Sequence, residues 1–150
     1  MTVLRIGIAA VATLVAFDPA APKEPFAYRM QMNPIEGPQN GAVNRRYTRQ
    51  WSACQERAFA TRENENCFVA ELARQDRLLN RTWPLTLRRF SPTMRKQLIA
   101  AQRKWNRARD PFCTERMNHY LGGTIMTTVY LDCQVELIIR RTMWLEKLGR

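Results

Sequence analysis

Four cysteines are the residues whose type and spacing offer this chain its most definite chemistry: Cys54, Cys67, Cys113 and Cys133. In an oxidising compartment an even cysteine count predicts a disulfide framework, and four cysteines permit three pairings. The alternative is a zinc site with four thiolate ligands. Structural zinc sites use cysteine pairs separated by about two to four residues, whereas twelve and nineteen residues intervene here. We therefore predict two disulfides and no metal site.

A pair of glycines favours one of these pairings. Gly122 and Gly123 form the strongest turn signal in the folded part, with helical patterns before and after them. If two antiparallel helices meet there, Cys113 lies nine residues before Gly122 and Cys133 ten residues after Gly123. The two thiols then sit at nearly the same height, as the short Cα separation of a disulfide requires. We predict a Cys113–Cys133 disulfide.

The same reasoning pairs the other two cysteines. Cys54 and Cys67 flank Ala60–Thr61, which has the composition of a chain break and a helix N-cap. We predict a Cys54–Cys67 disulfide, and each closed loop is expected to add about 3 kcal/mol to the free energy of unfolding.

Helical spacing of apolar residues runs through the rest of the folded part. We expect main helices from about residue 62 to Trp83, ended by Pro84; from Pro92, with Ser91 as its cap, towards the glycine turn; and over about 124–148. A short helix is expected over about 44–58. The prediction is an all-α, small disulfide-stapled helical bundle of three main helices plus a short N-terminal helix. The expected core residues are Phe68, Leu72, Leu79, Trp83, Met94, Leu98, Ala101, Trp105, Met126, Val129, Tyr130, Cys133, Leu137, Trp144 and Leu148.

The N-terminal residues predict export. Arg5 precedes an uncharged stretch, residues 6–17, which has signal-peptide length and is too short to span a bilayer as a helix. We expect residues 1–21 to be a signal peptide or N-terminal anchor, 22–43 a proline-rich tether and 44–150 the folded domain. The protein is therefore predicted to be periplasmic or secreted, in the bacterial envelope, with membrane contact only through an uncleaved N-terminus.

The chain is strongly basic, with a formal net charge of +11. Between Ser91 and Asp110 the only acid is Asp110 itself. The cations of this span are Arg95, Lys96, Arg103, Lys104, Arg107 and Arg109. They form either a solvated face, with one or two cations paired to acids, or a site for an anionic partner.

The inventory of reactive groups argues against an enzyme. His119 is the only histidine, and it lies just before the glycine turn, where an exposed loop position is expected. Neither a GxSxG nor an HExxH pattern occurs, and no glycine loop that could cradle a phosphate is present. We predict no catalytic residue and no cofactor.

Residues 54–145 resemble the LprI-like lysozyme-inhibitor family, of the N-terminal domain type. The most specific part of the resemblance is Ala101-Gln102-Arg103, Trp105, Arg109-Asp110, Cys113, Gly122-Gly123, Tyr130, Cys133, Leu137 and Arg141-Thr142. An earlier part is Cys54, Thr61, Glu63, Cys67, Asp76 and Leu79-Asn80. The chain departs from the pattern at Trp83 and Ala108, where the family usually has tyrosine, and at Pro84, which interrupts a normally helical region.

The resemblance implies a small exported helical domain with paired cysteines, some members of which bind and inhibit c-type lysozyme. The polar members of the motif fall where helices would face one another, and buried charges require partners. We therefore expect a structural polar network made of Asp76, Asn80, Gln102, Arg103, Arg109, Asp110 and Arg141.

Two kinds of partner follow from these observations. The resemblance implies a c-type lysozyme or other muramidase, contacted through the turn His119, Tyr120, Leu121, Gly122 and Gly123. Against this, such enzymes are generally basic, so a chain of net charge +11 should repel them at long range. The charge itself implies anionic envelope components (lipopolysaccharide, acidic glycan or lipid headgroups), contacted through Arg95, Lys96, Lys104 and Arg107. A structural interaction protein fits the same sequence, whereas export argues against nucleic acid.

Overall fold

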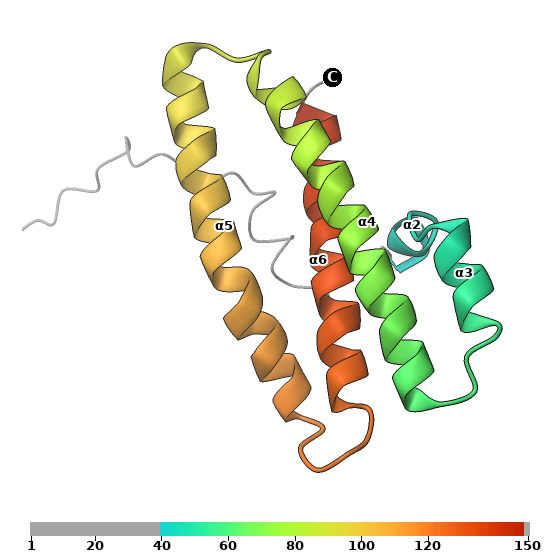
Figure 1. Ribbon diagram of the computed structural model, residues 1–150. Helices are drawn as coiled ribbons and strands as arrows, with labels where there is room; N and C mark the ends of the chain where they lie inside the picture. The colour runs from blue at the N-terminus through green and yellow to red at the C-terminus, as the bar shows by residue number, and fades with distance from the viewer. Residues whose placement is uncertain (1–39, 149–150) are drawn as a thin grey trace, which may run out of the picture.

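The computed structural model describes residues 40–148, which form an all-α bundle without strands (Figure 1). Three long helices dominate it: α4 (Thr61–Leu87), α5 (Pro92–Asn118) and α6 (Met126–Leu148). Two short helices, α2 (Asn40–Asn44) and α3 (Arg49–Gln55), precede them. α6 contacts α4, α5 and α2, while α3 packs on α4. The predicted fold class is confirmed, with α6 as its central element.

The N-terminal helix was predicted as one segment, 44–58, and is two. Thr48 separates them because its backbone is extended and its hydroxyl accepts a hydrogen bond from the backbone N–H of Trp51 (3.2 Å), which caps α3. Val43 is buried in α2 against α6. The predicted signal or anchor, and most of the predicted tether, lie outside the described residues.

Pro84 does not end α4, contrary to the prediction. The helix continues to Leu87, so Pro84 lies in its last turn. A proline there removes one backbone hydrogen bond, to the carbonyl of Asn80. Both residues are exposed, so water can satisfy that carbonyl. The helix therefore tolerates the proline.

α5 begins as predicted. The hydroxyl of Ser91 accepts a hydrogen bond from the N–H of Met94 (3.3 Å), and Pro92 takes the first helical position. Leu98 and Trp105 are buried, but Met94, predicted to be in the core, is 42% exposed. It sits in the first turn of α5.

α6 is buried on every side over much of its length. Residues 133–142 are all buried, polar and charged ones included. The sequence predicted that one apolar stripe of this helix is buried. In the structure, all faces of α6 are buried over residues 133–142. Two hydrophobic clusters share it: one holds Trp105, Leu137 and Ile138, and the other holds Val135 and Ile139.

Both predicted disulfides are present. Cys113–Cys133 joins α5 to α6 with a Cα–Cα distance of 5.6 Å, and Cys54–Cys67 joins α3 to α4 with 5.7 Å. Among residues 40–148, no helix has both the length and the apolar character of a membrane span.

Replacing Cys113 and Cys133 together by alanine is expected to lower the free energy of unfolding by about 3 kcal/mol, because the bridge restricts the unfolded chain across a 20-residue separation. Urea denaturation of oxidised wild type and variant measures the difference. An unchanged unfolding midpoint and slope would contradict this assignment of stability to the bridge.

Candidate functional site

The loop between α5 and α6, residues 119–125, carries three exposed apolar side chains close together in sequence. Leu121 is 73% exposed, and Tyr120 and Ile125 are 45% and 47% exposed. Large apolar side chains displayed together on a small domain mark an interaction surface. His119, beside them, is also exposed and takes the C-cap position of α5.

The backbone of this loop is tightly turned. Gly122 has a φ of +81°, a conformation that side-chain-bearing residues rarely adopt. The N–H of Gly123 donates to the carbonyl of Tyr120 (2.9 Å), and a Cβ at Gly123 would lie 3.1 Å from that same oxygen. The Cys113–Cys133 bridge joins α5 to α6 near this loop. The apolar side chains are therefore displayed on a restrained backbone, which lowers the ordering cost of binding.

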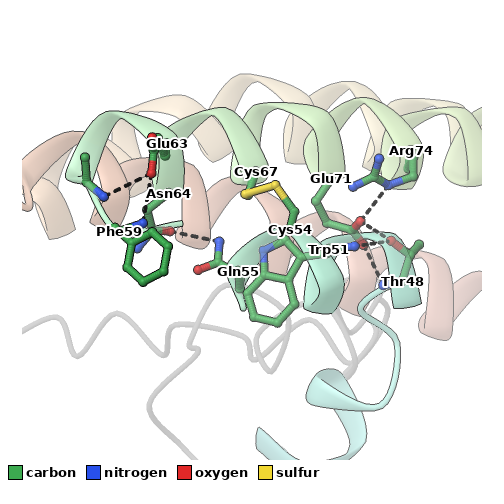
Figure 2. The surroundings of a disulfide bond; sticks show 11 residues. Thr48, Trp51, Cys54, Gln55, Phe59, Glu63, Asn64, Cys67, Glu71 and Arg74 are labelled. Carbon is green, nitrogen blue, oxygen red and sulfur yellow. Dashed lines mark hydrogen bonds and ion pairs between the residues drawn. A yellow bond between two sulfur atoms is a disulfide. The ribbon is translucent and has the colours of Figure 1, made fainter. Parts of the chain in front are cut away.

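A second disulfide-closed loop, residues 56–60, displays Phe59, which is 96% exposed. Figure 2 shows how its backbone is held: the carboxylate of Glu63 accepts hydrogen bonds from the N–H groups of Phe59 (2.8 Å) and Ala60 (3.2 Å). These two bonds lower the pKa of Glu63. Nearby, Gln55 donates to Asn64 (2.8 Å) across the same break.

Both loops lie at one end of the bundle, and the turn between α4 and α5 lies at the other (Figure 1). We call the end of the bundle that carries both loops the loop end, and define it as residues 56–60 and 119–125. The sequence predicted a contact surface at residues 119–123 but not at Phe59. The sequence signal for Phe59 is that it is a lone aromatic residue inside the segment that the Cys54–Cys67 bridge closes.

The predicted cationic contact residues do not join the loop end. Arg95, Lys96, Lys104 and Arg107 are exposed on α5, and Arg95 and Lys96 lie in its first turns, at the opposite end of the bundle. The guanidinium of Arg95 donates to the carbonyls of Phe90 (2.8 Å) and Arg88 (3.3 Å). Arg95 therefore holds the α4–α5 turn together.

The seven residues predicted to form one polar network are dispersed. Gln102 accepts from Arg141 (2.7 Å) and Asp110 accepts from Tyr130, and both contacts join α5 to α6. Asn80 donates to Asp76 (2.9 Å) within α4, on its exposed side, and so links no helices. Of the remaining two residues, Arg109 lies over the Trp105 ring at 5.3 Å, and Arg103 is exposed.

A polar network that the sequence analysis did not predict ties α3 to α4. Glu71, fully buried on α4, accepts hydrogen bonds from the N–H and hydroxyl of Thr48 and from the side chain of Arg74 (2.8 Å) (Figure 2). It also accepts one from the side chain of Gln75 (2.7 Å). Gln75 also donates to the carbonyl of Arg46 (2.8 Å). The available signal was that Glu71 and Gln75 continue the helical spacing of the α4 core stripe.

Burial and hydrogen bonds have opposite effects on the pKa of Glu71. Burial alone raises the pKa of this carboxyl, but the hydrogen bonds from Gln75, Thr48 and Arg74 outweigh burial, and the pKa is lowered. A lowered pKa means that the ionised group stabilises the fold above its unfolded pKa, and that this contribution is lost as the pH falls.

Two further acids of α6 accept hydrogen bonds from neighbouring side chains. Asp132 accepts from the Tyr47 hydroxyl (2.7 Å), and burial is the main reason that the pKa values of both groups are raised. Glu136 accepts from Arg116 (2.9 Å) on α5 and from Arg140 (2.6 Å) one turn later on α6. These acids serve helix packing. Within residues 40–148, no three His, Cys, Asp or Glu side chains gather as a metal ion would require.

Comparison with known families agrees with this architecture. The family model described as "Lysozyme inhibitor LprI" matches residues 52–145. The chain belongs to the LprI lysozyme inhibitor family. The match includes both disulfides and the loop end of this LprI domain. No curated protein and no solved structure matches the chain significantly.

Replacing Glu71 by Gln is expected to lower the free energy of unfolding of the LprI domain by about 2 kcal/mol at pH 7, because charge-assisted hydrogen bonds are lost and a buried amide faces two donors. The difference from wild type should shrink as the pH falls below about 4.5, where wild-type Glu71 also loses its advantage. Urea denaturation at pH 7 and pH 3.5 measures both effects. A difference that is constant across this range would contradict the role given to the Glu71 charge.

Proposed function

We propose that this protein is an exported envelope protein that binds a lysozyme-type muramidase and blocks it through the loop end. Membership of the LprI lysozyme inhibitor family supports this kind of partner. The observation that carries the choice of surface is the exposed Tyr120, Leu121 and Ile125 on a disulfide-restrained loop. Two disulfides in so small a domain support folding in an oxidising compartment, periplasmic or extracellular.

The distribution of charge answers the objection that two basic proteins repel each other. Residues 56–66 and 110–128, which surround the loop end, carry five acids and three Lys or Arg. Residues 77–109 carry ten Lys or Arg and no acid. A basic partner that approaches the loop end therefore meets a slightly acidic surface, whereas the acid-free segment 77–109 runs from α4 through the α4–α5 turn into α5.

The proposed contact inhibits by occupation of the enzyme's cleft. Burying a side chain such as Leu121 contributes about 1.5 to 3 kcal/mol of favourable transfer free energy. The restrained turn reduces the entropy lost on binding, so more of this contribution remains as affinity. Phe59, displayed from the second loop of the same end, extends the contact surface. No catalytic residue of the inhibitor is required by this mechanism.

Replacing Leu121 by Asp is expected to weaken inhibition of c-type lysozyme at least about tenfold, because a carboxylate would have to be desolvated in the contact. The matched control is Leu85→Asp, the same substitution at a side chain that is 52% exposed on α4, far along the helix from the loop end. Turbidity loss of a cell-wall suspension, followed at increasing inhibitor concentration, measures the effect.

Unchanged lysis at a large excess of the wild-type protein would refute inhibition of the lysozyme used. Inhibition that falls equally in both leucine variants would refute the choice of the loop end.

A further inference from the structure

The end of the bundle opposite the loop end is a concentrated cationic surface. We call it the cationic end and define it as residues 81–96, the last turns of α4, the α4–α5 turn and the first turns of α5. Five cations lie in these sixteen residues: Arg81, Arg88, Arg89, Arg95 and Lys96. The nearest acids in sequence are Asp76 and Asp110, so no carboxylate of this segment offsets the charge.

Three of these cations form no ion pair with the described residues. In the described part of the chain, Arg88, Arg89 and Lys96 have no ion-pair partner, and all three are exposed. The acid in the last turns of α6, which ends near this side of the molecule in Figure 1, is Glu146, and Arg46 holds it at 2.7 Å. Arg95 fixes the shape of the turn through its bonds to the Phe90 and Arg88 carbonyls.

The cationic end also contains two exposed apolar side chains. Leu85 is 52% exposed and lies on the same face of α4 as Arg81, four residues before it; Arg88, the C-cap residue of α4, follows three residues later. Met94, in the first turn of α5, is 42% exposed. A soluble polyanion would attract the cations and gain little from exposed leucine and methionine. An anionic lipid surface rewards both, because phosphates attract the cations while apolar side chains enter the headgroup boundary.

We infer that the cationic end docks on an anionic lipid membrane surface. The charge of the sequence implied lipid headgroups as one of several anionic components contacted through Arg95, Lys96, Lys104 and Arg107. The cationic end adds Arg81, Arg88 and Arg89, from the end of α4 and the α4–α5 turn. Docking in this way directs the loop end away from the bilayer, because the two surfaces lie at opposite ends of one bundle. The inference does not depend on muramidase binding, and either can fail without the other.

The test is sedimentation of the full chain, disulfides intact, with vesicles of phosphatidylcholine alone or with about one third phosphatidylglycerol, in dilute buffer and at higher salt. We expect at least about tenfold tighter binding to the anionic vesicles, lost as salt is added. Arg88→Glu with Arg89→Glu should remove at least about tenfold of that affinity. The matched control is Arg57→Glu with Arg62→Glu, the same charge change at exposed arginines near the loop end, which should change affinity less than about threefold.

Leu85→Ser with Met94→Ser separates a lipid surface from a polyanion. This pair should weaken vesicle binding about fivefold and leave binding to heparin, a soluble polyanion, unchanged. Equal binding to neutral and anionic vesicles would overturn the inference. So would equal losses in the two arginine pairs, which would indicate net charge alone, or full vesicle affinity in the serine pair, which would indicate a polyanion site. Circular dichroism of each variant confirms that it is folded.

Discussion

The burial of α6 on all sides is the constraint on which the rest of the structure depends. Each polar group between Cys133 and Thr142 must find a partner inside the protein, because water does not reach it. Glu136 is held by Arg116 and Arg140, and Arg141 bonds Gln102 while stacking on Trp144 at 4.0 Å. The bonds of Glu136 to Arg116 and of Arg141 to Gln102 reach from α6 to α5, so they fix the neighbouring helix as well as α6 itself.

The bundle around α6 holds the loop end and the cationic end at opposite ends of the molecule. The Cys113–Cys133 bridge ties α5 to α6 close to the loop end, and the Cys54–Cys67 bridge ties α3 to α4 close to the same end. Strong positive charge accumulates along α5 and at the α4–α5 turn. One rigid bundle thus presents apolar loops of slightly acidic surroundings at one end and a cationic surface at the other. The proposed muramidase contact and the inferred membrane contact can therefore be made at the same time.

Local signals in the sequence predicted most of the fold. The positions of Cys113 and Cys133 relative to Gly122–Gly123 predicted one bridge, and the break at Ala60–Thr61 predicted the other. Ser91–Pro92 predicted the start of α5. The differences arise from tertiary context. The local sequence does not show that Pro84 lies exposed in the last turn of α4, where a helix tolerates proline. It also does not show that Thr48 caps α3. The site was predictable where a turn marked it, at residues 119–123. Phe59 and the Glu71 network were missed because only packing distinguishes a displayed aromatic residue, or a buried carboxylate with partners, from ordinary surface and core positions.

Amide hydrogen exchange of the full chain, free and bound to a c-type lysozyme, tests the central claim that a rigid α6 supports a binding surface at the loop end. We expect residues 133–142 to be the slowest to exchange in both states, and residues 119–125 to exchange rapidly in the free protein and slowly in the complex. Residues 81–96 should not change. Exchange in α6 as fast as in the loops, or protection gained at residues 81–96 in place of 119–125, would contradict the account.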